Sequence, residues 1–192
     1  MSIRMSRTAR RPVAATFAAI GALALVLASP MAASAATVDA AVTNGQAPAA
    51  IYTGATGSST VVLDGAGFKY NPAWAGPPFI TAGIYVAFGP DVAIADSYAD
   101  ASVFSASEGG VIWTHNGAAA ATNQWELSTA GVFTDLPLTV ESTFSDGNDN
   151  TFTCTTSPTD TTAGSVDCFV YTFSAHGSFD RTNDNKIPVY FG

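Results

Sequence analysis

The sequence predicts an all-β protein, built as an antiparallel β-sandwich, and three observations support this. Short runs rich in Val, Ile, Thr and aromatic residues recur along the chain, and several of them alternate with period two. Gly, Pro, Asn and Asp separate these runs as turn residues. No stretch beyond the first 35 residues has the length and the period of a convincing helix. A closed barrel is the alternative architecture, and the lack of a fixed repeat disfavours a solenoid or propeller.

The first 35 residues have the features of a secretory signal peptide. Arginines precede an apolar stretch from Val13 to Ala28, and small residues at 33–35 suit signal peptidase. We therefore expect residues 1–35 to be removed and the mature chain to begin at Ala36. A retained membrane anchor is the alternative, but the apolar stretch is short for a spanning helix, so no transmembrane segment is expected after cleavage. An arginine pair in the leader leaves twin-arginine export open as the route.

Removal of the leader makes the chain strongly acidic. The full chain has a net charge of −8, and four of its seven Lys and Arg residues lie in the leader. The mature chain keeps all 15 Asp and Glu residues, so its net charge is 3 minus 15, or −12. Such a chain repels phosphate backbones, which makes nucleic acid an improbable partner. We expect a protein that is secreted, extracellular or loosely associated with the cell wall.

We expect an N-terminal entry segment over residues 36–54 and the sandwich over residues 55–192. Between the expected strands lie a Pro-rich loop at 69–78 and a long acidic connection at 91–110, with one helical turn around 97–103. The runs predicted as strands are 60–63, 84–88, 111–113, 124–127, 132–143, 151–154, the run after Cys168, and 187–191.

The only two cysteines, Cys154 and Cys168, lie on either side of a polar loop. In a secreted chain they are most simply one disulfide that closes a hairpin. The loop holds thirteen residues, and closing a loop of about that length stabilises a fold by roughly 3 kcal/mol on the chain-entropy model. Two free thiols or a metal pair would require a reducing compartment or further ligands.

Three blocks of the chain resemble a known family. The runs VVLDGAGFKYNP, GIYVAFG and DCFVYTFSAHGSFDRTNDNKIPVYF are similar to the small immunoglobulin-like domain of secreted actinobacterial proteins. That domain is similar to the neocarzinostatin-like apoproteins and also occurs beside haem-uptake modules of the HtaA type. The resemblance spans residues 55–192 and implies an immunoglobulin-like sandwich of about seven strands. In neocarzinostatin-like proteins, a cleft at one end holds an aromatic chromophore.

This chain departs from the resembled family in its cysteines. Neocarzinostatin-like apoproteins have two disulfides, one of which forms the floor of the ligand cleft, whereas this chain has a single Cys pair. A role as carrier of an apolar aromatic molecule is therefore kept as an alternative. The haem-binding pattern of HtaA modules is not recognisable in this chain, and no cofactor is expected.

Two groups of aromatic residues are candidates for ligand binding. Phe169, Tyr171 and Phe173 fall on one face of the strand after Cys168. They predict either an aromatic wall for an apolar ligand or, as the favoured interpretation, core packing between the sheets. Tyr70 and Trp74 lie in the Pro-rich loop, where the fold does not require an aromatic residue.

The only histidines, His115 and His176, follow strand patterns and stand next to turn residues. Either could ligate haem iron or a metal ion, but no partner ligands are visible at a suitable spacing, and we expect turn residues and no metal site. His176, Asp180 and Arg181 match the A-H-G-x-x-D-R block of the resembled domain. The expected role of these three is a structural turn, with Arg181 paired to a carboxylate.

Asp146, Asn148 and Asn150 form a D-x-N-x-N run, which begins like a calcium-binding loop. Position six is Thr151 where the loop needs Gly, and position twelve is Ser157 where it needs Glu. We therefore expect a solvated turn between strands.

No catalytic motif occurs in the chain: there is no G-x-S-x-G elbow, H-E-x-x-H pair, P-loop or dinucleotide fingerprint. We expect a secreted, non-enzymatic binding or surface-associated module, whose partner is an apolar or aromatic small molecule or a cell-surface component. The alternatives are a neocarzinostatin-like carrier and a structural component of the cell wall or matrix.

Overall fold

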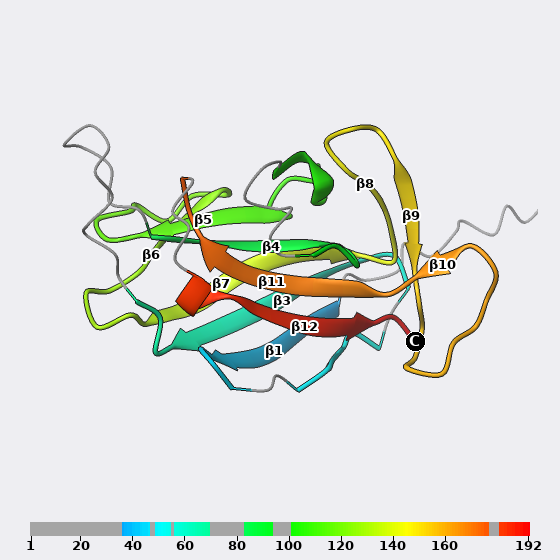
Figure 1. Cartoon of the computed structure of the whole chain (residues 1–192), viewed down its shortest axis with the longest axis horizontal. Coiled ribbons are helices and arrows are strands. Elements are labelled where there is room, and N and C mark those ends of the chain that lie inside the picture. The colour runs from blue at the N-terminus through cyan, green and yellow to red at the C-terminus, as the bar shows by residue number, and fades with distance from the viewer. Residues whose placement is uncertain (1–35, 47–48, 55, 70–82, 94–100, 177–180) are drawn as a thin grey trace, which may run out of the picture. The chain divides into compact units, whose positions relative to one another are not determined.

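The structure is a computed structural model that describes residues 36–46, 49–54, 56–69, 83–93, 101–176 and 181–192 (Figure 1). The chain divides into two units, 1–32 and 33–192, and the fold described here belongs to the second. Within the described ranges the regular elements are β-strands and two 3-10 turns, η1 (Ala101–Val103) and η2 (Arg181–Asn183). No helix among these residues has the length and apolar character needed to cross a membrane.

One layer of the sandwich is a three-stranded sheet in the order β1-β3-β7. Its strands are β1 (Ala36–Thr43), β3 (Ser58–Ala66) and β7 (Phe133–Glu141). β3 runs antiparallel to β7 and parallel to β1. β3 buries alternate residues, the pattern of a strand with one face on the core and one on the solvent.

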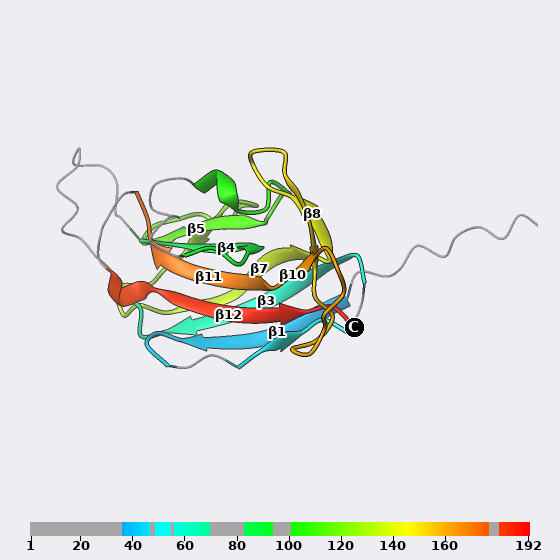
Figure 2. The ribbon, with the colours of Figure 1, turned by 45° about the vertical axis from the view of Figure 1, so that its right-hand side comes forward.

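The other layer is a six-stranded sheet in the order β2-β12-β11-β4-β5-β6. Its strands are β2 (Ile51–Tyr52), β4 (Ile84–Pro90), β5 (Val111–His115), β6 (Gln124–Glu126), β11 (Cys168–Ser174) and β12 (Asn185–Tyr190). The central pairs are antiparallel, whereas β2 and β6 join the two edges in parallel. Figure 2 shows this sheet stacked over β1 and β3.

A third, small sheet of β8 (Thr143–Ser145), β9 (Thr151–Cys154) and β10 (Ser165–Val166) lies at one end of the sandwich (Figure 1). The predicted disulfide between Cys154 and Cys168 is confirmed, with an S–S distance of 2.03 Å. Both cysteines are buried. The bond therefore ties β9 of the small sheet to β11 of the six-stranded sheet.

The core between the two main sheets consists of aliphatic and aromatic side chains that alternate with outward-facing residues. Each fully buried Val, Leu, Ile or Phe contributes about 1.5–3 kcal/mol relative to an exposed one. The principal members are Val61, Leu63, Leu136, Leu138 and Val140 from one sheet, and Ile84, Val86, Phe88, Ile112, Val170, Ile187 and Val189 from the other.

The prediction of an all-β sandwich is confirmed. Seven strands of five or more residues, β1, β3, β7, β12, β11, β4 and β5, form the two facing sheets. The predicted antiparallel pairing holds for β3 with β7 and for the pairs from β12 to β5, whereas β1, β2 and β6 pair in parallel at sheet edges. The two-residue strands β2 and β10 escaped prediction because they are too short to show a period.

The described residues of 36–54 belong to the sandwich, although the sequence predicted an entry segment before it. β1 pairs with β3 over eight consecutive residues, and β2 pairs with β12. The segment therefore supplies an edge strand to each sheet. Its alanines have low β-propensity, and pairing with the apolar strand β3 overrides that preference.

Candidate functional site

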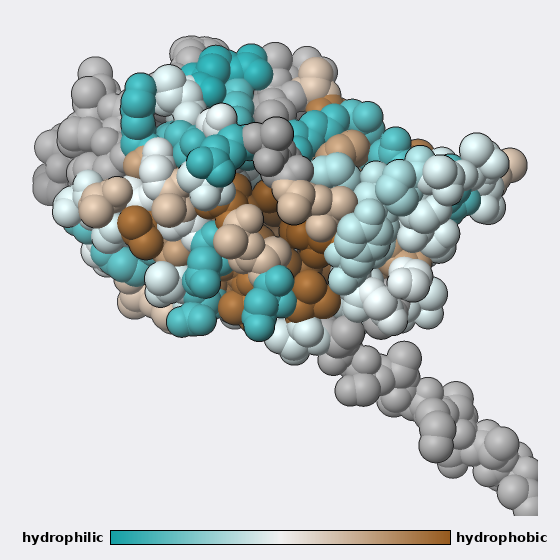
Figure 3. Space-filling view, turned by 90° about the horizontal axis from the view of Figure 1, so that it is seen from below, coloured by the Kyte–Doolittle hydropathy of each residue, from teal (hydrophilic) through white to brown (hydrophobic). Residues whose placement is uncertain are grey.

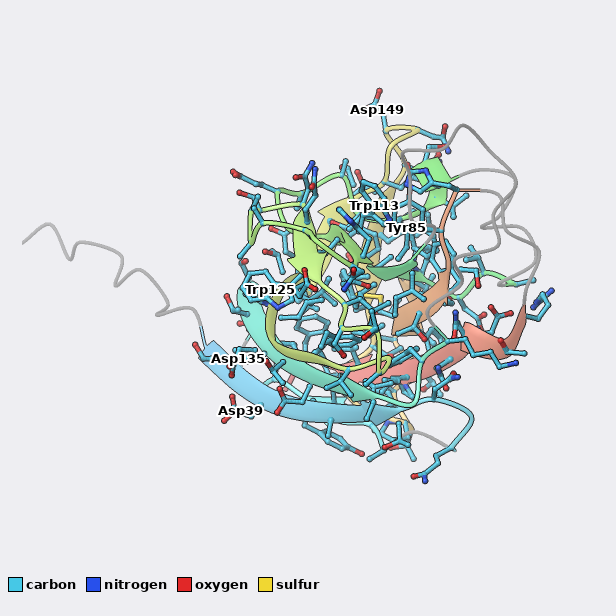
Figure 4. The ribbon with its side chains drawn as sticks, turned by 90° about the vertical axis from the view of Figure 1, so that its left-hand side faces the viewer. Asp39, Tyr85, Trp113, Trp125, Asp135 and Asp149 are labelled. Atoms are coloured by element: carbon cyan, nitrogen blue, oxygen red, sulfur yellow. A yellow bond between two sulfur atoms is a disulfide. The ribbon has the colours of Figure 1, made fainter. Side chains whose placement is uncertain are left out.

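The outer face of the six-stranded sheet carries a row of aromatic rings, whose side chains point away from the core between the two sheets. In the strand register Phe173 of β11 is opposite Tyr85 of β4, and Tyr85 is opposite Trp113 of β5. Directly opposite residues on one face bring their side chains into contact. The rings of Tyr85 and Phe173 have centroids 5.5 Å apart, and Figure 4 shows Tyr85 and Trp113 close together.

The connection between β4 and β5 covers one half of this outer face. Phe104 is buried against Phe173, with stacked rings 5.3 Å apart, and against Tyr171, with centroids 5.2 Å apart. The ring fits because Gly89 has no side chain: a Cβ atom there would lie 2.8 Å from Phe104 Cδ1. These residues form a second small core, distinct from the one between the sheets.

This arrangement corrects the favoured interpretation of Phe169, Tyr171 and Phe173 as packing between the two sheets. Cys168 and Val170 are the residues of this strand in the main core, and the aromatic neighbours of Val170 face outward. Tyr171 and Phe173 are nevertheless buried beneath the connection that contains Phe104. They therefore support the outer face and do not offer a surface to a ligand.

Polar contacts fasten the same connection to the sheet. The Tyr171 hydroxyl donates to the Pro90 carbonyl at 2.6 Å and accepts from the Val92 amide at 3.0 Å. Burial raises the pKa of Tyr171 well above its usual value, so this hydroxyl stays protonated. Lys186 forms an ion pair with Asp91 and lies over the half-buried Phe169 ring, with 4.1 Å between Nζ and the ring centroid.

The other half of the outer face carries a cluster of half-buried rings, which we call the ring cluster: Tyr85, Trp113, His115 and His176. Trp113 stacks on His115 with 3.8 Å between centroids, and His176 meets the indole edge-on at 4.4 Å. Tyr85 completes the group at 5.7 Å from His176. The only two histidines of the chain, far apart in sequence, thus contact the same indole.

The two histidines have different surroundings. His115 ends β5, and its ring nitrogens lie 3.3 Å from the Asn116 carbonyl and 3.4 Å from Gln124 Oε1. His176 follows β11 with a left-handed φ of 53°, a conformation found in turns. Burial, and then the nearby His115, lower the pKa of His176 below its ordinary value of 6.5. The imidazole of His176 is therefore neutral at neutral pH.

A glycine allows the ring cluster to assemble. Gly83 precedes β4 with a φ of +60°, and a Cβ atom there would lie 2.0 Å from the Thr114 carbonyl oxygen and 2.9 Å from the Cβ of His115. Only glycine tolerates both this φ and so close an approach of β5.

Several other predicted site residues have separate positions or lie outside the described ranges. Tyr70, Trp74 and Asp180 are among the residues that the structure does not describe. Arg181, the first residue of η2, forms an ion pair with Asp184, which follows that turn directly.

The D-x-N-x-N run forms the tight turn between β8 and β9. Asp146 is buried, and its carboxylate accepts hydrogen bonds from the backbone amides of Asn148 and Asn150, both at 2.9 Å, and from Asn150 Nδ2 at 3.0 Å. These bonds occupy both carboxylate oxygens in local turn contacts. Within the described ranges, no group of three or more His, Cys, Asp or Glu residues could hold a metal ion.

No protein-family model, curated protein or solved structure matches this chain.

Neither Tyr85 nor Trp113 was predicted from the sequence as a site residue. A signal was present, since Tyr85 alternates with the apolar residues Ile84 and Val86, and Trp113 alternates with Ile112 and Thr114. That alternation puts each ring on one face of its own strand. It does not tell which strands are neighbours or which residues stand opposite one another.

Proposed function

We propose that this chain is a secreted, non-enzymatic binding module that uses the ring cluster to hold a flat, uncharged aromatic ligand. The observation that carries the proposal is the stack of Trp113 on His115, edge-on to His176, on the outer face of the sheet. A sandwich fills its core from its inner faces. A half-buried group of two histidines and an indole outside that core is therefore not required by the fold.

The chemistry of these side chains selects the ligand class. Indole and phenol rings present large apolar surface with few rotatable bonds and favour contacts with other rings. The neutral imidazole of His176 adds apolar surface without charge. The excess of carboxylates over the whole chain repels anions. A planar molecule with little negative charge fits these conditions best.

Tryptophan fluorescence tests the proposal, because one of the chain's three tryptophans is in the cluster. The mature protein is titrated with 2-naphthol, which is uncharged at neutral pH, and binding heats are measured by calorimetry. We expect quenching that saturates, and we expect Trp113→Phe to weaken binding about tenfold, the equivalent of about 1.4 kcal/mol.

Trp125→Phe is the matched control. Trp125 is also half-buried, but it lies on β6 and donates from Nε1 to the Thr134 carbonyl at 2.7 Å, outside the ring cluster. This variant should keep the affinity of the parent. Absence of saturable binding, or equal loss in both variants, would count against the ring cluster as the site. The narrower role of a carrier requires in addition that the ligand stays bound through gel filtration.

A further inference from the structure

A groove opens along one edge of the sandwich, remote from the ring cluster in strand order. It lies between β1 and the β2–β12 edge of the other sheet and has a volume of about 300 Å³. Val38, Ala40, Ala50, Ile51 and Ile187 are among the residues that line it. Figure 3 looks at this side of the molecule and shows apolar residues gathered in its middle, with hydrophilic ones around them.

The groove exists because the side chains at this edge are too small to close it. The interior of a sandwich is normally filled to the density of an organic crystal. Here four alanines line the groove, Ala40 and Ala41 from β1 and Ala49 and Ala50 just before β2. Tyr52, which also lines the groove, is 56% exposed. A row of larger apolar side chains from outside would complete the core at this edge.

β1 is also an open edge for backbone pairing. Among the described residues it pairs with β3 alone, over eight residues in an unbroken register. Proteins block long edge strands with lysine, proline or a bulge, and β1 contains none of these. The facing edge of the six-stranded sheet is less open to pairing, since β12 contains Pro188 and already pairs with β2.

The negative charge of the three-stranded sheet favours a positively charged partner. Its strands contain four carboxylates and no Lys, Arg or His. Asp39 lines the groove, and Asp64 accepts a hydrogen bond from the Asp135 amide at 3.0 Å. Figure 4 shows Asp39 and Asp135 on the same side of the molecule. A second copy of the chain would bring more negative charge to this edge, whereas a basic segment would be attracted.

We propose that β1 is the docking edge for an extended, basic segment of a partner protein. The segment adds as a strand beside β1 through backbone hydrogen bonds. Its alternate apolar side chains enter the groove beside Ala40 and Ala50, and its Lys or Arg side chains on the other face lie near Asp39. This inference goes beyond the proposed function, because it concerns a different surface and a different class of partner.

The test uses the mature protein and a fluorescein-labelled peptide of alternating valine and lysine, with fluorescence anisotropy as the readout. A valine–glutamate peptide controls for charge. A valine–lysine peptide with N-methyl groups on alternate residues of one edge controls for strand pairing, since it lacks the amide donors. We expect the first peptide to bind, more weakly as salt rises, and both controls to bind at least about tenfold more weakly.

Three variants locate the binding. Asp39→Lys reverses the charge at the edge, and Ala50→Trp fills the groove; each should weaken binding about tenfold or more. Glu108→Lys makes the same charge change at an exposed position outside β1 and the groove, and it should leave binding unchanged. Circular dichroism identifies the variants that keep the parent fold.

Four results would overturn the proposal. The first is no change in anisotropy up to about 100 µM protein, a range that covers even weak peptide affinities. The second is that the N-methylated peptide binds as tightly as the unmodified one, and the third is that Asp39→Lys and Glu108→Lys weaken binding equally. The fourth is a dimer of the parent protein in sedimentation that is lost in Ala50→Trp. The last result would assign the edge to a second copy of the chain.

Discussion

His176 meets the indole ring of Trp113 edge-on, with 4.4 Å between ring centroids, although the two residues belong to segments far apart in the chain. Trp113 is on β5, and His176 stands in the turn after β11. β4 lies between these strands and pairs with both, so the contact depends on the whole sheet. The properties of His176 therefore report on the ring cluster.

Stability should depend on pH through His176. Its pKa in the folded protein is lowered by burial and by His115, so the folded state binds fewer protons than the unfolded state as the pH falls below 6.5. The contribution of the neutral imidazole is complete above about pH 6.5 and is lost as the pH falls through the folded-state pKa. The residues that face His176 in the cluster, Tyr85, Trp113 and His115, include no carboxylate to reverse this sign.

His176→Asn isolates the effect, because asparagine tolerates the left-handed φ of 53° at this position. Urea unfolding midpoints at about pH 7.5 and pH 5 should fall further on acidification in the parent than in the variant. Equal falls in both proteins would show that His176 does not carry the dependence.

Gly83→Ala should destabilise the fold and disturb the ring cluster. A Cβ atom at Gly83 would meet the Thr114 carbonyl oxygen at 2.0 Å, so β5 and His115 would have to move. Gly117→Ala is the matched control, since Gly117 has a φ of +80° but no atom within 4 Å of its Cβ position. In the control, the free energy of unfolding should fall only by the cost of placing a non-glycine residue at positive φ, about 1–2 kcal/mol.

The two glycine variants are compared by urea unfolding and by the tryptophan emission spectrum. Gly83→Ala should lose more free energy of unfolding than Gly117→Ala, and only Gly83→Ala should shift the emission. Equal losses with unchanged spectra would mean that the close approach at Gly83 relaxes without effect on the cluster.

Removal of the disulfide should lower the free energy of unfolding by about 3 kcal/mol, because the bond closes a loop in the unfolded chain. The variant is Cys154→Ala combined with Cys168→Ala, and denaturant unfolding measures the loss. Hydrogen exchange should quicken first in β8, β9 and β10, since the bond ties that sheet to β11. Uniform quickening across all sheets would contradict this local role.

Asp146→Ala should destabilise the turn between β8 and β9 by about 1–3 kcal/mol, the cost of leaving donors without their acceptor. The carboxylate of Asp146 accepts three hydrogen bonds from Asn148 and Asn150. Asn148→Ala keeps the backbone donor at an exposed position and should change stability little. We expect millimolar calcium to leave the melting temperature of the parent unchanged; a rise abolished by Asp146→Ala would reveal a calcium site.

Sequence patterns were sufficient to locate most long strands, but they did not tell which face of a strand packs against the main core. The runs at 84–88 and 151–154 coincide with β4 and β9, because strong alternation or turn boundaries mark them. In β11 both faces are largely buried, so the alternation of Phe169, Tyr171 and Phe173 could not tell the main core from the second one. β1 was underestimated because its alanines carry little local preference.

The residues alone define an acidic, all-β chain with one cysteine pair and predict a leader, because composition, charge and period are local properties. Which strands become neighbours is not local, since it depends on how sheets bury their apolar faces against distant segments. Tertiary packing therefore placed Phe173, Tyr85 and Trp113 in one row, and among the described residues it left β1 as an acidic strand at the edge of its sheet. Both candidate binding surfaces of the protein arise from that long-range pairing.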